Sequence, residues 1–159
     1  GLAILDGLWS GEPFHFDGEF YTLSEMTFLP RPVQSPRIPI WIGGGWNTKP
    51  AARRAANWDG FFPQKWQQLI TVDEWRGIID RVSENRSSDA PMTFIQNGRT
   101  PGEDPARAAE MVAPFADMGL DWWIEHVEPW RFGMDWGDFL TEEAAETMRM
   151  RVRQGPPRA

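Results

Sequence analysis

Short apolar runs alternate with amphipathic stretches from residue 38 to the end of the chain. The apolar runs are 38–42, 59–63, 92–95 and 120–127. The amphipathic stretches that follow them, with apolar positions at helical spacing, are 50–57, 73–86, 105–118 and 142–153. Strand-sized runs that alternate with helices are typical of a parallel sheet with right-handed crossovers. Both a closed barrel and an open doubly wound sheet satisfy this pattern.

A different pattern precedes these four units. Leu2, Leu5 and Leu8 follow helical spacing, which predicts a helix that ends near residues 10–11. Residues 14–23 surround Asp17-Gly18, a favoured two-residue turn, and predict a β-hairpin. An extended connector follows, because four prolines exclude a helix there: Pro30, Pro32, Pro36 and Pro39.

The helix boundaries carry further information. Residues that cap helices stand where the later helices begin, namely Thr48, Thr71 (or Asp73), Asp104 and Thr141. No such residue precedes Leu2, and the chain begins with Gly1 rather than methionine. We therefore expect a chain cut from a longer one at its start, whereas residues 151–159, with a glycine and two prolines, resemble a natural ending.

Composition narrows the classes of function. A chain of 159 residues, 41% of them hydrophobic, predicts a single structural unit with a real core over 1–159. Its net charge of −7 repels phosphate backbones, so no nucleic-acid partner is expected. Cysteine is absent, and neither His15 nor His126 has a neighbour at metal-ligand spacing, so no metal site is predicted. The apolar runs are too short to span a membrane, so we expect a cytoplasmic protein without a membrane partner.

The clearest chemical signal is the glycine run Gly43-Gly44-Gly45, which follows the first apolar run and precedes a helix. Glycines let the backbone approach a ligand closely, and the start of the next helix offers unpaired N–H groups suited to phosphate. The alternative is a tight strand-to-helix turn without a ligand. The spacing matches neither a dinucleotide fingerprint nor a P-loop.

Several segments resemble one family in the order that its members carry them. Residues 30–63, with PRPVQSPRIPIWIGGG and then AARRAANWDGFFP, are similar to the central signature of the luciferase-like monooxygenase superfamily. LWSGEPFHFDGEFYTL at 8–23, MGLDWWIEHVEP at 118–129 and the closing RQGPPR match neighbouring family segments. The resemblance implies an α/β fold: the second half, strands 5–8, of a (β/α)8 TIM barrel with a β-hairpin insertion. It also implies reduced FMN or an 8-hydroxy-5-deazaflavin coenzyme as cofactor.

The resemblance also implies site residues. The glycines Gly43, Gly44 and Gly45 would contact the ribityl–phosphate side of the flavin, and Pro63 and Gln64 would end the next strand beside the same pocket. Some relatives have a hydroxyl residue where this chain has Gln64. Among the tryptophans near the glycine run, Trp46 is the best candidate to stack on the ligand, and simple packing is its alternative reading.

The last apolar run offers a second set of candidates. If Trp123 and Glu125 point into the barrel, they would line the substrate pocket, with Glu125 a weak catalytic candidate. The alternative for Glu125 is a structural ion pair with an arginine. His126, on the other parity, is expected to be a packing or surface histidine. Arg53 and Arg54 follow the glycine run and favour surface salt bridges over an anionic ligand.

These observations favour part of a flavin-dependent oxidoreductase or monooxygenase that acts on a small organic substrate. The parent protein would be the enzyme, because half of the pocket wall would lie outside this chain, and the isolated chain is expected to be inactive. Its expected partners are the missing N-terminal half-barrel or a second copy of itself. Two alternatives remain open: a glycoside-hydrolase-type barrel fragment using Asp59 or Glu125 as a carboxylate, and a non-catalytic assembly fragment.

Overall fold

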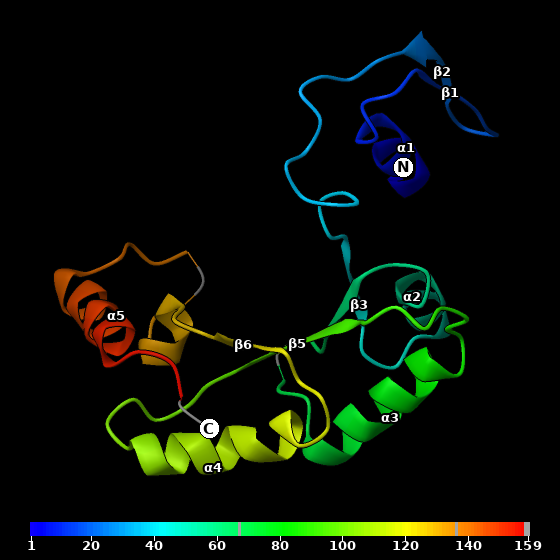
Figure 1. The fold of residues 1–159 in the computed structure, drawn as a ribbon. Coiled ribbons are helices and arrows are strands. Elements are labelled where there is room, and N and C mark those ends of the chain that lie inside the picture. Colours follow the sequence, from blue (N-terminus) through cyan, green and yellow to red (C-terminus); the bar gives the residue numbers. More distant parts are fainter. Residues whose placement is uncertain (67, 136, 158–159) are drawn as a thin grey trace. The chain divides into compact units, whose positions relative to one another are not determined.

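The computed structural model describes residues 1–66, 68–135 and 137–157. The chain divides into two compact units, Gly1–Ile40 and Trp41–Ala159. Figure 1 shows a helix and a two-stranded sheet in the first unit, and a four-stranded sheet with helices in the second. The interpretation of residues 1–159 as one unit of a barrel stays a prediction. No helix in the described ranges is long and apolar enough to cross a membrane.

The first unit contains the helix α1 (Leu2–Leu8) and the antiparallel strands β1 (Phe14–Asp17) and β2 (Thr22–Met26). The predicted hairpin is present, but its two-residue turn is wrong. Asp17 pairs with Thr22 inside the ladder, and the amide of Gly18 donates to the carbonyl of Tyr21 at 3.0 Å, so the connection is longer. The predicted turn would need positive φ angles at both central residues, and Gly18 is not among the glycines with positive φ.

The second unit is built on a parallel sheet in the order β3-β4-β5-β6. Its strands are β3 (Trp41–Gly45), β4 (Gly60–Gln64), β5 (Thr93–Gly98) and β6 (Trp122–Glu125). The predicted α/β class with a parallel sheet is therefore confirmed. One boundary was wrong: the glycine run lies inside β3 and pairs with β4, rather than following a strand at 38–42. Pro39 lacks an N–H group, which weakens that earlier segment as a ladder strand.

Helices follow the strands at the predicted places. They are α2 (Lys49–Ala55), α3 (Val72–Ser83), α4 (Pro105–Ala116) and α5 (Glu142–Gln154), and a 3-10 helix, η1 (Pro129–Phe132), precedes α5. The side chains of Thr71, Asp104 and Thr141 each accept a hydrogen bond from the backbone of the first helical turn. Thr48 occupies the N-cap position of α2 but makes no such bond.

Side chains alternate between the two faces of the sheet. One face is covered by helices, because Phe94 of β5 packs against Trp75 of α3 and Trp123 of β6 packs against Phe115 of α4. Trp75 is fully buried there at 0% exposure. We call this the helix-covered face, and Figure 1 shows α3 and α4 running along it.

The opposite face, which we call the open face, carries the other parity of each strand. It presents large apolar side chains to solvent: Trp41, Trp122 and Ile124 are 44%, 56% and 40% exposed. The same face also presents polar side chains, Gln64 on β4 and Asn97 on β5. Toward the carboxyl ends of the strands the open face therefore carries both polar and apolar side chains, since Ile124 lies level with Asn97.

Candidate functional site

The carboxyl ends of β3 and β4 bring the predicted cofactor residues together. In the parallel register Gly44 pairs with Pro63 and Gly45 pairs with Gln64. The amide of Trp46 then donates to the carbonyl of Gln64 at 3.0 Å, so the ladder continues one residue beyond β3. All six predicted residues therefore lie side by side on two neighbouring strand ends, where barrel enzymes place their active sites. We call this group the glycine mouth: Gly43, Gly44, Gly45, Trp46, Pro63 and Gln64.

The three glycines differ in their surroundings. A Cβ on Gly44 would lie 2.6 Å from the Cβ of Ala51 on α2, and one on Gly45 would lie 2.9 Å from Cγ2 of Thr48. Gly44 and Gly45 therefore let the following helix approach the strand. Gly43 is exposed, and a Cβ there would meet nothing within 4 Å. Close approach of the following helix therefore does not explain the glycine at position 43.

Trp46 is held by its neighbours. The Nζ atom of Lys65 lies 5.0 Å from the centre of its ring and also pairs with Glu74 at 2.6 Å. The guanidinium of Arg81 donates to the carbonyl of Trp46 at 3.2 Å. One face of the ring is thus occupied by a cation from the chain, and stacking of Trp46 on a ligand stays a prediction.

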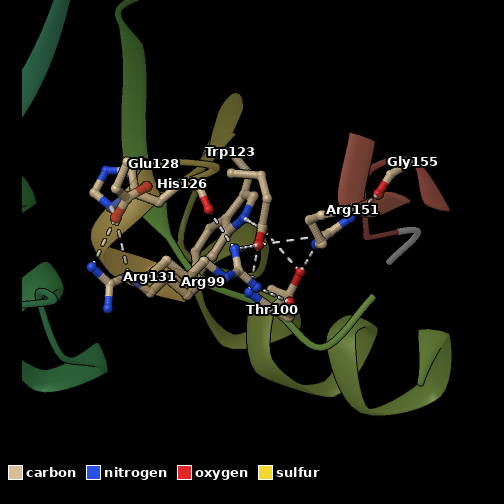
Figure 2. A network of polar contacts seen from close by, with 9 residues as sticks. Arg99, Thr100, Trp123, His126, Glu128, Arg131, Arg151 and Gly155 are labelled. Carbon is tan, nitrogen blue, oxygen red and sulfur yellow. Dashed lines mark hydrogen bonds and ion pairs between the residues drawn. The ribbon is translucent and has the colours of Figure 1, made fainter. Parts of the chain in front are cut away.

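Glu125 ends β6 and is the centre of a partly buried network, and Figure 2 labels its partners Thr100, Trp123, Arg131 and Arg151. Its Oε1 accepts hydrogen bonds from the amide of Thr100 at 2.7 Å and from Arg131 at 2.6 Å, with Arg151 at 3.2 Å. Its Oε2 accepts from the hydroxyl of Thr100 at 2.8 Å and from the indole of Trp123 at 2.9 Å. A carboxylate offers about four lone-pair sites, so these donors occupy the whole group.

The network keeps Glu125 ionised. Burial, the largest single influence, raises the pKa of Glu125, but hydrogen bonds from the Thr100 amide, Trp123, Arg131 and the Thr100 hydroxyl lower it below its ordinary value. Glu125 thus forms ion pairs with two arginines, and its oxygens have no free acceptor site for a substrate proton. A catalytic role for Glu125 stays a prediction that this geometry does not favour.

The orientation assumed for Trp123 and Glu125 needs correction. Trp123 packs against Phe115 of α4, with ring centroids 5.9 Å apart, so this parity of β6 lies on the helix-covered face. A Cβ on Gly98 would lie 2.2 Å from the Trp123 ring, which shows that the ring lies across the neighbouring strand. The two side chains therefore do not point toward the open face, which a shared substrate pocket would have required.

Sequence reasoning missed the residues that hold this network: Thr100, Arg131 and Arg151. Arg151 is buried at 6% exposure and donates to the hydroxyl of Thr100 at 2.9 Å. One signal was available, because Arg151 falls on the same helical stripe as Ala144 and Met148, where an arginine needs a carboxylate partner. Nothing in the sequence identified Arg131, whose partners come from two segments, Glu125-His126 and Thr100.

A second polar group lies beyond β6, where Figure 2 shows His126 and Glu128 close together beside Arg99. Nδ1 of His126 lies 3.3 Å from Oε1 of Glu128. The same oxygen accepts two hydrogen bonds from Arg99, at 2.8 and 3.2 Å. His126 was expected to be a packing or surface histidine, and its side chain is 32% exposed beside the Glu128 carboxylate. We call these three residues the histidine cluster.

The remaining candidates lie apart from these groups. Arg53 and Arg54 are exposed on α2, and within the described ranges neither forms an ion pair. A shallow depression lies between α5 and the segment after β6, lined by Val127, Leu140, Ala145, Met148, Arg149, Val152 and Arg153. Its arginines are paired with glutamates of α5, and none of the predicted site residues lines it.

The glycosidase alternative needs two carboxylates roughly 5–9.5 Å apart. Its two candidates lie at opposite ends of the sheet, because Asp59 precedes β4 and Glu125 ends β6. In the register, Gly60 lies level with Thr93 and Glu125 with Gly98, so the two are about six residues or roughly 20 Å apart along the strands. They do not form such a pair.

Comparisons with known proteins agree on one family. A family described as luciferase-like monooxygenase matches residues 2–154. An uncharacterized protein of Mycobacterium tuberculosis is 42% identical over 95 residues, which cover 57% of this chain and 30% of that protein. An FMNH(2)-dependent dimethylsulfone monooxygenase of Pseudomonas putida is 34% identical over 58 residues, covering 36% of this chain and 16% of the relative.

A third relative matches over a longer stretch. An F420-dependent glucose-6-phosphate dehydrogenase of Kineococcus radiotolerans is 28% identical over 131 residues, which cover 75% of this chain and 35% of the relative. The chain thus spans at most about a third of the length of the relatives described here, from 16% to 35%. Their names include both a flavin-dependent and a deazaflavin-dependent enzyme.

Proposed function

Because the chain belongs to the luciferase-like monooxygenase family, we propose that it is part of a flavin- or deazaflavin-dependent oxidoreductase and supplies one side of the cofactor site. Relatives that depend on FMNH(2) and on F420 support this class of cofactor. The single observation that carries the proposal is the glycine mouth. It combines an exposed backbone at Gly43 with two adjacent parallel strand ends.

We place the four strands as the fifth to eighth of a (β/α)8 barrel, with the hairpin of β1 and β2 as an insertion. The parallel order β3-β4-β5-β6, with a helix after each strand, supports this placement. The remaining strands would be supplied by sequence outside this chain.

The residues of the glycine mouth fit a cofactor that carries a phosphate. Gly43 is exposed with open space beside it, and the adjoining side chains of Gln64 and Trp46 offer a polar group and a ring. Lys65 adds a positive charge beside Trp46. When bound, the flavin or deazaflavin ring supplies the redox chemistry, while this chain orients the ring and limits the access of water.

The substrate class that we propose first is a small organic molecule with a hydroxyl group. One of the relatives described above is named as a glucose-6-phosphate dehydrogenase, and glucose 6-phosphate carries hydroxyl groups. The polar side chains of Gln64 and Asn97 near the carboxyl ends of the strands suit a hydroxyl compound. In this proposal Trp123 and Glu125 hold the segment after β6 in place by hydrogen bonds and do not line the site.

Cofactor titration tests the proposal. We expect FMN or deazaflavin to quench the tryptophan fluorescence of the full-length protein, expressed with whatever sequence its gene encodes around these residues. Gly43→Leu should weaken the affinity at least about tenfold, because the added side chain enters open space at the mouth. Gly77→Leu is the matched control, since a Cβ on Gly77 also meets nothing within 4 Å but lies on α3.

Two results would overturn the proposal. One is a wild-type protein that binds neither cofactor. The other is a Gly43→Leu variant that binds as tightly as the wild type, since the site would then lie away from the glycine mouth. Circular dichroism of both variants checks that the substitutions leave the fold intact.

A further inference from the structure

The depression between α5 and the segment after β6 has a volume of about 520 Å³ and is lined mainly by apolar side chains. We call it the α5 groove, and its apolar lining residues are Val127, Leu140, Ala145, Met148 and Val152. Leu140 and Val152 are 55% and 65% exposed. Exposed apolar surface that is bordered by charged residues is typical of a protein interaction site.

The helix α5 presents one apolar stripe to this groove. Ala145, Met148 and Val152 are three and four residues apart, so they lie along one face of the helix. Ala144 and Arg151 lie on another face, which is buried against the rest of the second unit. The helix therefore packs on its own chain with one face and leaves a second, apolar stripe facing the α5 groove.

Charge is divided along α5. Its acidic residues come first and its basic residues follow: Glu142, Glu143, Glu146, Arg149, Arg151 and Arg153. Four of them lie beside the apolar stripe and pair within the helix, namely Glu142, Glu146, Arg149 and Arg153. Their side chains are 46–86% exposed, and exposed ion pairs contribute little stability. Such pairs can therefore exchange for pairs with another chain that carries the same residues.

We propose that the α5 groove binds α5 of a second copy of this chain, with the two helices antiparallel about a two-fold axis near Met148. In this arrangement Glu142 of one copy lies level with Arg153 of the other, and Glu146 lies level with Arg149. A parallel pair would bring like charges together, so the charge pattern selects the antiparallel orientation. Both copies use the same surface in a two-fold interface, so each apolar stripe fills the groove of the other copy.

The first test measures dimerisation of the full-length protein, expressed with whatever sequence its gene encodes around these residues. We expect sedimentation velocity to detect a dimer at micromolar concentration. Val152→Lys should raise the dimer dissociation constant at least about tenfold, because it puts a charge into the apolar stripe. Met150→Lys is the matched control, since Met150 is 53% exposed on the same helix but does not line the groove. Trp122→Lys should also keep the dimer, which separates this surface from the open face.

The second test exchanges charges between the two copies. Its two double variants are Arg149→Glu with Arg153→Glu, and Glu142→Arg with Glu146→Arg. Each alone should dimerise at least about tenfold more weakly than the wild type, because like charges then face one another. An equimolar mixture should restore the dimer, since an acidic α5 then meets a basic one. Ion pairs within a single chain cannot produce this restoration, and circular dichroism checks that both variants are folded.

The dimer proposal fails on any of three results. One is a full-length wild type that stays monomeric, in which case another segment covers the groove or solvent fills it. Another is a Val152→Lys variant that dimerises as tightly as Met150→Lys. The third is a mixture of the double variants that is no more dimeric than each variant alone. None of these measurements involves the cofactor, so this proposal and the proposed function stand or fail separately.

Discussion

Trp41 and Trp122 lie on the two outermost strands of the sheet, yet their ring centroids are only 5.8 Å apart. Three strand spacings in a flat sheet amount to about 14 Å. The two tryptophan side chains therefore extend toward each other across the open face, and their rings meet there. Gly60 lies beneath this contact, since a Cβ there would be 2.6 Å from the Trp41 ring.

We predict that this ring pair contributes to stability. Trp41→Ala and Trp122→Ala should each lower the free energy of unfolding, and a double-mutant cycle should give a coupling of about 0.5–1.5 kcal/mol, typical of aromatic pairs. Urea titration measures it. Trp66, which is 87% exposed, is the control, and Trp66→Ala should change stability by less than about 0.5 kcal/mol. Strictly additive Trp41 and Trp122 effects would argue against the contact.

Gly44 should tolerate no side chain. Its added Cβ would lie 2.6 Å from the Cβ of Ala51, so Gly44→Ala should cost roughly 1–3 kcal/mol of stability through overpacking. Ala51→Gly removes the opposing methyl group, and the double variant should therefore be less destabilised than the sum of the two single variants. Gly43→Ala, where nothing lies within 4 Å, should be close to neutral. Thermal or urea unfolding of the four variants checks this, and equal effects at both glycines would contradict it.

We predict that Glu125 makes the free energy of unfolding depend on pH in the acidic range. Its pKa is lowered in the folded chain from an ordinary value of 4.5, so the stabilisation is fully present above that pH. It is lost as the pH falls through the lower, folded-state pKa, because the folded form must then accept a proton that it binds weakly. Glu125→Gln should flatten the stability curve in this acidic window.

The same substitution has an effect at neutral pH. Glu125→Gln should cost roughly 1–3 kcal/mol there, since buried donors of Arg131 and Arg151 lose a charged acceptor. Urea titrations from pH 3 to pH 7 measure both effects. Glu74, whose pKa is also lowered, contributes equally to both proteins, so their difference isolates Glu125. Parallel curves for the two proteins would refute the assignment.

Two threonines at helix N-termini, Thr71 and Thr48, should contribute differently to stability. Thr71 forms a capping box with Glu74, in which its hydroxyl accepts from the Glu74 amide and the Glu74 carboxylate accepts from the Thr71 amide at 2.9 Å. Thr71→Ala should therefore cost about 1 kcal/mol. Thr48→Ala is the matched control and should cost less, because Thr48 makes no side-chain cap bond. A larger loss at Thr48, measured by urea unfolding, would reverse this ranking.

The isolated chain should associate with itself. Its open face exposes Trp41, Trp122 and Ile124, and the outer edges of β3 and β6 have no strand neighbour among the described residues. Sedimentation velocity should detect dimers or larger species at micromolar concentration. Trp122→Lys should shift the distribution toward monomer, whereas Trp66→Lys should not. A monodisperse monomer at all concentrations would show that this face does not drive association.

The sequence by itself determined the elements of the second unit and their order. Apolar runs with helical stretches between them predicted four parallel strands. This prediction needed only local periodicity, because the spacing of apolar residues along a segment reflects which of its side chains face the core. Asp104 and Thr141 correctly predicted where their helices begin, since a capping side chain bonds only to backbone amides in the first turn of its own helix. The glycine mouth was also predictable, as a strand end followed by a helix that glycine lets approach closely.

Tertiary structure decided the rest. Alternation assigned Trp123 and His126 to opposite faces, but only packing against Phe115 fixed which face is covered by helices. Arg131 and Thr100 meet Glu125 from segments that are distant in the chain, and no local pattern encodes such a meeting. The same holds for Glu128 and Arg99 beside His126. The periodicity of side chains predicts which residues of one strand share a face. Which residues of other segments they contact is decided only when the strands pair in the folded chain.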